Sequence, residues 1–261
     1  MNNKILILLP LLVFATALCG QQKDYTVNVN PFIGTGGHGH TYPGATAPYG
    51  MVQLSPDTRL TGWDGCSAYH YSDQVIYGFS HTHLSGTGCS DYGDILLMPV
   101  SGAVDLKNYA YASSFSHKNE KARPGYYSVK LDKHKIQVEL TATQRAGMHK
   151  YEFEEPGQNS VVLDLEHRDQ VIDSYIEFVN NTTVRGMRTS RAWAQKQILY
   201  FEIQFSKPFS HYGLCEIDSG GGIKKTYTDK ASGKRVKAFF TFEGQKEILV
   251  KVGLSATSVE G

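Results

Sequence analysis

Short runs of β-branched and aromatic residues, separated by Gly, Pro, Asn and Asp, are the feature that most limits how this chain can fold. From Tyr25 onward such runs recur every ~8–12 residues, which is typical of strands in a sandwich or barrel. Polar and apolar residues alternate within "GYYSVKL", "IQVELTAT" and "LYFEIQF". Alternation puts one face of a strand against a core and the other in water, as in packed antiparallel sheets. The sequence therefore predicts an all-β antiparallel β-sandwich.

The predicted strands occupy most of the chain after residue 49. They are Gly50–Leu54, Ile95–Pro99, Gly125–Leu131, Ile136–Thr143, His149–Phe153, Ser160–Leu165, Ser174–Val179, Thr183–Ser190, Ile198–Phe205, Val236–Phe242 and Glu247–Leu254. Two turn-rich stretches, Ser219–Gly222 and Ala231–Lys234, flank the segment "IKKTYTD". We interpret that segment as a projecting hairpin.

The first 20 residues have the features of an export signal. Lys4 supplies a positive charge, and the apolar run Ile5–Leu18 is shorter than the ~20 residues that a membrane-spanning helix needs. We therefore predict a cleaved signal peptide over residues 1–20, no transmembrane segment, and a domain spanning residues 21–261. The protein is then exported to the periplasm or cell surface. Cys19 leaves a lipoprotein open, although Leu18 is a poor residue to precede a lipidated cysteine.

Charge and length exclude some classes of protein. The chain of 261 residues carries 26 basic and 25 acidic side chains, with a net charge of +1. No long run of like charge occurs, so we expect no nucleic-acid partner. The length is enough for one large domain with a substantial core, or at most two small domains.

Four cysteines are present, and three remain if Cys19 is removed with the signal. An exported compartment permits a disulfide, and Cys66 with Cys89 is then the preferred pair because both lie in the densest motif region. Two buried free thiols are the alternative. Cys215 and the others show no CxxC spacing of the kind that binds zinc.

A glycine-rich segment, "NPFIGTGGHGHTYPGA", covers residues 30–45. Its glycines allow close approach of the backbone to a neighbour or ligand. A phosphate-binding loop would need a helix N-terminus after it, and Pro43 and Pro48 argue against one. His38 and His40 can chelate a metal if the chain is extended, because residues two apart share a face. We favour the alternative, in which both are hydrogen-bonded loop histidines.

Trp63 and Asp64 stand side by side between Gly62 and Gly65. This pairing suits a sugar, whose apolar ring face packs on indole while its hydroxyls bond to the carboxylate. The alternative is a buried tryptophan followed by an aspartate in a turn.

The segment "YGFSHTHLSGTGCSDYGD", residues 77–94, has the highest density of polar side chains. His81 and His83 share a face if the chain is extended, but a zinc site would need a third ligand that spacing does not identify. The pattern of a nucleophile elbow, G-x-S-x-G, does not occur here. We expect a polar site with an undefined ligand. The side chains that add donors and acceptors or stand as third-ligand candidates are Ser85, Thr87, Asp91, Asp94 and His70.

Arg188 and Trp193 form a further cluster in "GMRTSRAWA". Arg188 can hold a hydroxyl or a carboxylate. We favour a simpler interpretation, in which it lies at the edge of the sandwich near a packed Trp193.

These segments, in this order, resemble glycoside hydrolase family 92. The matching stretches are "VNPFIGTGGHGHTYPGATAPYGMVQLSPDT", "GWDGCSAYHYSD", "IYGFSHTHLSGTGCSDYGDILLMP", "RPGYYSVKL", "VELTATQRAGMHKYEF" and "FSKPF". The resemblance implies a supersandwich-like N-terminal domain packed on a C-terminal (α/α)6 domain, with the active site between them. It also implies an exo-acting, calcium-dependent, inverting α-mannosidase that degrades mannose-containing glycans such as N-glycans.

In the family, the general acid and general base belong to the C-terminal domain, as do most groups that coordinate calcium. Inversion places those carboxyls ~6.5–9.5 Å apart, with a water between them. Nothing that matches the (α/α)6 domain occurs before Gly261. We therefore expect the catalytic domain to be absent, with no catalytic residue and no metal ligand in this chain, and the isolated chain to be inactive.

The resemblance also places sugar-contacting loops in this domain. Ala68 and Cys89 depart from the family pattern, so the family does not imply a Cys66–Cys89 disulfide. Two other functions stay open: a free-standing carbohydrate-binding module, and a metal-binding β-protein that uses His38, His40, His81 and His83. The predicted substrate-binding residues are Trp63, Asp64, His81, His83, Ser85 and Gly86.

Overall fold

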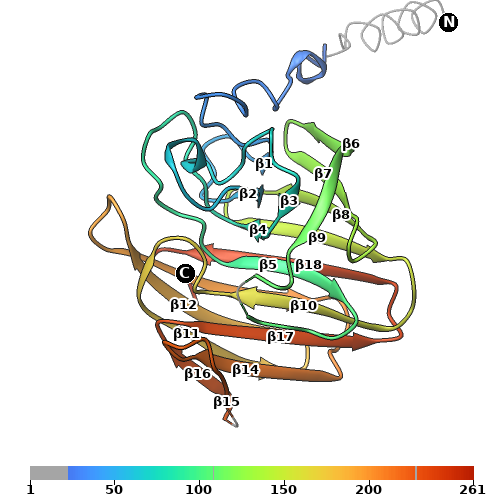
Figure 1. The fold of residues 1–261 in the computed structure, drawn as a ribbon, viewed down its shortest axis with the longest axis vertical. Helices are drawn as coiled ribbons and strands as arrows, with labels where there is room; N and C mark the ends of the chain where they lie inside the picture. Colours follow the sequence, from blue (N-terminus) through green and yellow to red (C-terminus); the bar gives the residue numbers. More distant parts are fainter. Residues whose placement is uncertain (1–22, 108, 227) are drawn as a thin grey trace, which may run out of the picture.

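The chain folds into two antiparallel β-sheets that pack face to face (Figure 1). The computed structural model describes residues 23–107, 109–226 and 228–261, so the predicted signal peptide with Cys19 lies outside the described residues. Two short 3-10 turns, η1 (Thr26–Asn28) and η2 (Trp63–Gly65), are the helical elements of the described residues. The predicted all-β antiparallel sandwich is confirmed.

The first sheet has eight strands. In spatial order they are β1 (Ala45–Thr46), β2 (Gln53–Asp57), β4 (Gly78–Ser80), β5 (Leu96–Ser101), β10 (Gln158–Asp164), β17 (Val236–Glu243), β14 (His211–Ile217) and β15 (Ile223–Thr226).

The second sheet has ten strands. In spatial order they are β16 (Lys230–Gly233), β11 (Gln170–Asn180), β12 (Thr183–Arg191), β13 (Gln197–Phe205), β18 (Glu247–Ser255), β9 (Ala146–Phe153), β8 (Ile136–Ala142), β7 (Tyr126–Leu131), β6 (Ser113–Arg123) and β3 (Val75–Ile76).

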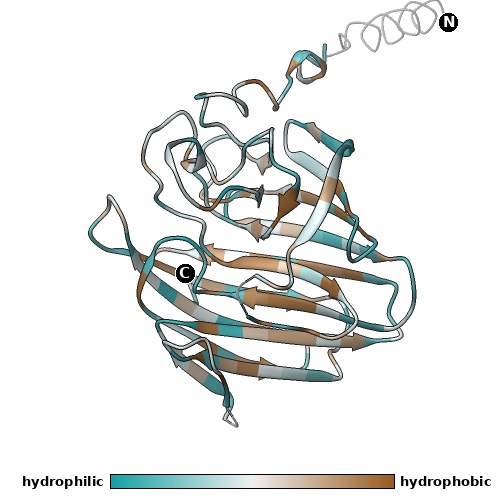
Figure 2. Ribbon diagram, in the orientation of Figure 1, coloured by the Kyte–Doolittle hydropathy of each residue, from teal (hydrophilic) through white to brown (hydrophobic). Residues whose placement is uncertain are grey.

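Strand sequence follows burial in both sheets. In β8 the apolar residues Ile136, Val138 and Leu140 are buried and the residues between them are more exposed, as period-two alternation requires. The central strands β5 and β10 are buried along almost their whole length, and hydrophobic residues occupy much of both (Figure 2). Such strands are covered on both faces, which explains why they lack alternation.

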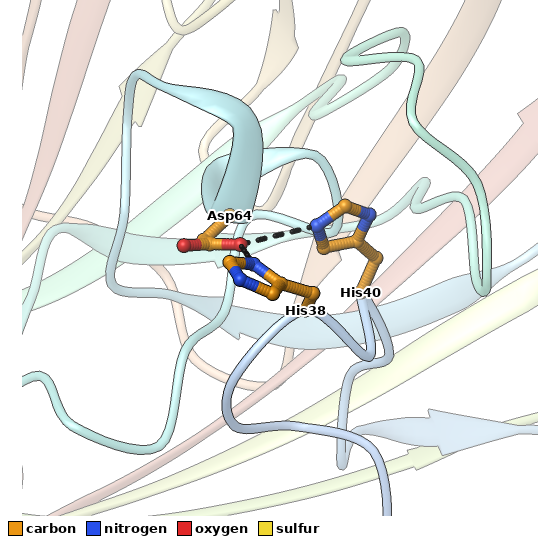
Figure 3. A group of neighbouring side chains, drawn as sticks. All are labelled: His38, His40 and Asp64. Atoms are coloured by element: carbon orange, nitrogen blue, oxygen red, sulfur yellow. Dashed lines mark hydrogen bonds and ion pairs between the residues drawn. The ribbon is translucent and has the colours of Figure 1, made fainter.

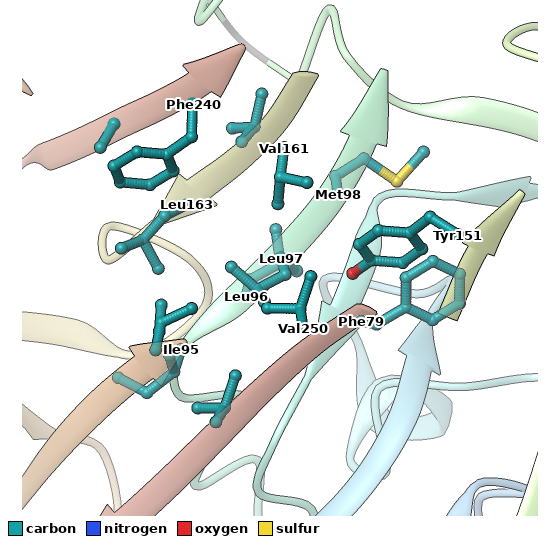
Figure 4. Close-up of a cluster of buried hydrophobic side chains, with 14 of the residues drawn as sticks. Phe79, Ile95, Leu96, Leu97, Met98, Tyr151, Val161, Leu163, Phe240 and Val250 are labelled. Atoms are coloured by element: carbon teal, nitrogen blue, oxygen red, sulfur yellow. The ribbon is translucent and has the colours of Figure 1, made fainter. Parts of the chain in front are cut away.

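The core lies between the two sheets (Figure 4). Phe79, Leu97 and Val161 from the first sheet are buried in one cluster with Tyr151 and Val250 from the second. Burial of apolar area on this scale is the main stabilising contribution to such a domain. It gives a firm support for the loops that join the strands.

All eleven predicted strands overlap strands of the structure, but β1, β3, β4, β6, β14 and β16 were not predicted. β6, "SSFSHKNEKAR", is largely polar, because it lies near the edge of its sheet and buries only Ser113, Phe115 and Glu120. A pattern search for apolar alternation therefore misses it.

The predicted hairpin in "IKKTYTD" is wrong. β15 pairs with β14 across a turn in which Asp218 Oδ1 accepts the amides of Gly220 and Gly222, both at 2.8 Å. β16 instead pairs with β11 in the other sheet, and Ala231–Gly233 lie in that strand rather than in a turn. Ala231 is buried there, which fixes the strand to the core.

Candidate functional site

Three loops meet at one end of the sandwich: residues 34–41, the η2 turn, and residues 84–89. The amide of Gly86 donates to the carbonyl oxygen of His40 at 2.7 Å. His40 Nδ1 lies 2.9 Å from the carbonyl oxygen of Thr87. Gly88 packs so closely on Trp63 that a Cβ at this position would lie 2.3 Å from the indole Cη2. The glycine-rich segment, the Trp-Asp pair and the polar segment of residues 77–94 therefore form one surface.

The loop of residues 34–41 is closed on itself. The amide of Thr41 donates to the carbonyl oxygen of Gly34 at 3.3 Å, and a Cβ on Gly39 would lie 2.1 Å from that same oxygen. Only glycine fits at residue 39. His40 has a φ of 53°, a left-handed conformation that is uncommon for a residue with a Cβ. Strained backbone of this kind persists where surrounding contacts hold it, often at functional sites.

Trp63 is exposed, with 62% of its surface accessible, so the alternative of a buried tryptophan is wrong. The edge of the His40 ring packs against the indole, with ring centroids 4.9 Å apart. Arg168 holds the turn from beneath, because its guanidinium donates to the carbonyl oxygens of Gly65 at 3.0 Å and Cys66 at 3.3 Å. The indole is thus contacted by His40 and its turn is held by Arg168, while most of its surface stays accessible to solvent.

The Asp64 carboxylate contacts the two histidines of the neighbouring loop (Figure 3). Its Oδ1 lies 2.7 Å from His38 Nδ1 and 3.3 Å from His40 Nε2. The hydrogen bond from His38 is the main cause that lowers the pKa of Asp64 below its usual value. Asp64 is therefore an ionised acceptor, suited to bonding with hydroxyl groups or a cation.

His81 and His83 lie inside the protein, where all four ring nitrogens have partners. His81 Nδ1 is 2.6 Å from the carbonyl oxygen of Ile95, and its Nε2 is 2.9 Å from Nε2 of His149. Burial lowers the pKa of His81 to about 4, so the ring is neutral at pH 7. A role for this ring in substrate binding stays a prediction.

His83 connects the core to a cleft. Its Nδ1 lies 2.8 Å from the carbonyl oxygen of Gln53, and its Nε2 lies 2.7 Å from Asp57 Oδ1. A cleft of about 410 Å³ is lined by His83, Leu84 and Tyr92 among others. Ser85 and Gly86 follow Leu84 in the sequence and are exposed. The loop of residues 84–89 therefore runs from this cleft to the contact of Gly88 with Trp63. The substrate-binding roles of His83, Ser85 and Gly86 also stay predictions.

Asp57 is the centre of a buried polar network that sequence reasoning missed. Its carboxylate accepts from Ser80 Oγ at 2.9 Å and pairs with His83 and His167. Burial raises the pKa of Asp57, but the two imidazoles outweigh it and hold the pKa well below its usual value. His167 lies 110 residues from Asp57 in the sequence, so no local pattern could have identified the pair.

Arg188 does hold a carboxylate, that of Asp94, and both side chains are fully buried. It also donates to the carbonyl oxygens of Leu165 at 3.0 Å and His167 at 2.6 Å. The prediction of an edge position near a packed Trp193 is wrong: β12 lies between β11 and β13, and Trp193 is 78% exposed. The guanidinium anchors the loop after β10 to the second sheet.

The cysteine alternatives are resolved in favour of free thiols. Within the part of the chain that the structure describes, Cys66, Cys89 and Cys215 form no disulfide, with Cys66 and Cys215 buried and Cys89 partly exposed. Burial raises the pKa of the Cys66 thiol, so it is a poor nucleophile.

One group of possible metal ligands occurs among residues 23–107, 109–226 and 228–261. It consists of His38, His40 and Asp64, whose ligand atoms lie within 4.8 Å of one another. His81 and His83 are not part of it, so the expected joint use of four histidines is wrong. Within the same residues, no helix is both long and apolar enough to cross a membrane.

Comparison with known proteins gives consistent matches. Residues 28–255 match the family model described as the glycosyl hydrolase family 92 N-terminal domain. The structure is similar to the family GH92 α-mannosidase BT3965 from Bacteroides thetaiotaomicron, solved in complex with mannoimidazole, with 32% identity and a TM-score of 0.84. That match covers 91% of this chain and 33% of the other.

Two further relatives are similar over parts of their length. The family GH92 inverting mannosidase BT2199 from Bacteroides thetaiotaomicron has 27% identity and a TM-score of 0.77, over 91% of this chain and 33% of that one. An uncharacterized secreted glycosidase from Arthroderma benhamiae is 30% identical over 154 residues, which are 56% of this chain and 20% of the relative. This chain thus spans a third or less of the length of these proteins.

Proposed function

Because the chain belongs to the glycosyl hydrolase family 92 N-terminal domain family, we propose that it supplies sugar-binding loops to an α-mannosidase. The enzyme is exported, calcium-dependent and inverting, and it removes mannose from mannose-containing glycans, including N-glycans. The partner of these loops is a C-terminal (α/α)6 domain. Similarity to two mannosidases and to a glycosidase described as secreted supports this proposal.

The observation that carries the proposal is the exposed indole of Trp63 next to the ionised carboxylate of Asp64. A pyranose packs its apolar face on an aromatic ring and donates its hydroxyl hydrogens to a carboxylate. The turn that carries both residues is held by Arg168 and Gly88, so the platform is ordered before a sugar arrives. Preorganisation of this kind lowers the entropic cost of binding.

Asp64 is suited to binding rather than to acid catalysis. A general acid needs a raised pKa so that it carries a proton at neutral pH. The hydrogen bond from His38 acts in the opposite direction on Asp64. This excludes Asp64 from our proposal for the catalytic acid, and we propose that the acid and base belong to the C-terminal domain, as the family resemblance implies.

The His38, His40 and Asp64 group is not suited to bind the calcium ion of the proposed enzyme. Calcium takes six to eight oxygen ligands, whereas the His38, His40 and Asp64 group offers two imidazole nitrogens and one carboxylate. This donor set does not fit calcium. We therefore propose that calcium is bound mainly by groups of the C-terminal domain.

A free-standing carbohydrate-binding module is the second candidate, and the exposure of Trp63 favours it equally. The two functions differ in what happens when this chain meets the catalytic domain. Mixing the purified 261-residue chain with a separately produced family 92 C-terminal domain should restore mannose release from α-1,2-linked mannobiose in the presence of calcium. Restoration would support the α-mannosidase proposal, and sugar binding without restoration would support the module.

Turnover by the 261-residue chain alone tests the placement of catalysis. We expect no release of mannose from α-1,2-linked mannobiose with calcium present. Clear turnover that persists after further purification would show that the catalytic carboxyls are among these residues and would overturn the proposal.

A further inference from the structure

We propose that His38, His40 and Asp64 form a site for a divalent transition-metal ion of the zinc class, at the surface beside Trp63. The three ligand atoms come from two loops and lie within 4.8 Å of one another (Figure 3). Two imidazole nitrogens and a carboxylate oxygen are a donor set typical of zinc. This inference does not depend on the proposed mannosidase function.

The hydrogen bonding of His40 fixes the state of its ring. The carbonyl oxygen of Thr87 can only accept, so His40 Nδ1, 2.9 Å away, carries the hydrogen of that bond. In the neutral imidazole, Nε2 then presents a lone pair toward Asp64 Oδ1, 3.3 Å away. Two acceptors face each other at that distance only if a positive species lies between them. A metal ion bound between Nε2 and the carboxylate oxygen would supply that positive charge.

The same contact is the kind of outer support that metal-binding histidines use. A ligating imidazole usually donates its second nitrogen to a carbonyl or carboxylate, which fixes its tautomer and orientation. For His40 that acceptor is the Thr87 carbonyl, and the Trp63 indole packs against the ring with centroids 4.9 Å apart. The ring is buried and held with Nε2 directed toward Asp64.

One of the three distances between ligand atoms already fits tetrahedral coordination, and the His38 ring must move to bring the other two into range, because the three atoms are spread over up to 4.8 Å. Zinc bonds of ~2.0–2.1 Å place neighbouring ligand atoms about 3.3 Å apart. His40 Nε2 and Asp64 Oδ1 are already 3.3 Å apart, whereas His38 Nδ1 and Asp64 Oδ1 are 2.7 Å apart. The His38 side chain is 80% exposed, so its ring is free to swing outward by the remaining distance.

Solvent has access to the site through the His38 side. Three protein ligands leave a fourth position for water or another ligand, as in zinc sites that are not purely structural. A bound ion would also join the loop of residues 34–41 to the η2 turn. Metal binding is therefore expected to stabilise this surface and to report through the adjacent Trp63.

Isothermal titration of the untagged, metal-stripped 261-residue chain with zinc chloride tests the proposal. We expect one zinc per chain with micromolar or tighter affinity. His38→Ala and Asp64→Asn should each weaken binding at least tenfold, and both side chains are exposed enough to be replaced without loss of the fold. His211→Ala is the matched control, because His211 is an exposed histidine 3.3 Å from the carboxylate of Glu243, and it should leave affinity unchanged.

A second readout places the ion. In a Trp193→Phe background, Trp63 is the remaining tryptophan, and nickel or copper bound at this site should quench its fluorescence. The proposal is overturned if no zinc binds, or if zinc binds equally well to His38→Ala and Asp64→Asn. Binding that leaves Trp63 fluorescence unchanged with nickel and copper would also overturn it.

Discussion

Gly88→Ala should displace the Trp63 indole without unfolding the domain. The added Cβ would lie 2.3 Å from Cη2 and 2.6 Å from Cζ3 of the ring. An ordinary contact begins near 3.4 Å, so the ring edge must move by about 1 Å. The backbone of Gly88 does not have the positive φ that would itself strain an alanine. The substitution is therefore expected to move the Trp63 indole and to leave the backbone at residue 88 unchanged.

The expected cost in stability is small, because Trp63 is mostly exposed and buries little apolar area. The indole loses its edge contact with His40, worth ~0.5–1.5 kcal/mol. The free energy of unfolding should therefore fall by no more than about 1.5 kcal/mol. Sugar binding should weaken about tenfold, which corresponds to ~1.4 kcal/mol, because the platform no longer lies beside Asp64.

Two measurements separate these effects. Urea unfolding gives the change in stability, and the emission spectrum of Trp63 in a Trp193→Phe background reports movement of the indole. Gly157→Ala is the matched control, because a Cβ there meets no atom within 4 Å and the backbone φ is not positive. If Gly88→Ala keeps both the Trp63 spectrum and the sugar affinity of the parent, Gly88 does not set the position of the platform.

Three further predictions concern the buried groups. Arg188→Met leaves the buried Asp94 carboxylate without its partner and should lower the free energy of unfolding by ~3–5 kcal/mol in a urea titration. Arg185→Met is the control, because it breaks a surface pair with Glu177 and should lower the free energy of unfolding by at most ~1 kcal/mol. Burial lowers the pKa of His81 to about 4, so its contribution to stability is complete above the unfolded value of 6.5 and is lost as the pH falls toward 4; ring NMR signals with a midpoint near 6.5 would contradict this. Burial raises the pKa of Asp169 to about 7, so its protonated form contributes stability below the ordinary value of 3.8 that is lost as the pH rises through 7. Asp169→Asn should therefore gain stability relative to the parent between those pH values, and parallel urea midpoints across that range would refute the assignment.

Strand positions were predictable because they depend on local patterns. β8 and β13 alternate apolar and polar residues along one buried face, and that pattern is visible in the sequence. β6 was missed because a strand near a sheet edge buries few apolar residues. The hairpin was misplaced because turn residues at Ala231–Gly233 do not show that the strand crosses to the other sheet.

The site was only partly predictable for a related reason. The Trp63-Asp64 pair could be recognised from its composition, since both residues are adjacent in the sequence. The contact of Asp64 with His38, 26 residues away, depends on how two irregular loops pack. His81 and His83 were predicted from the family resemblance of their segment, and neither the resemblance nor the residue type shows whether an imidazole faces solvent or the core.

We propose that the surface around Trp63 and Asp64 binds mannose-containing sugars. Calorimetric titration of the 261-residue chain with α-1,2-linked mannobiose tests it directly, with Trp63→Ala and Trp193→Ala in parallel. Both tryptophans are exposed, but only Trp63 lies beside Asp64. We predict weak binding, in the millimolar range, that Trp63→Ala abolishes and Trp193→Ala preserves. No heat at millimolar sugar, or equal binding by the Trp63→Ala variant, would contradict the claim.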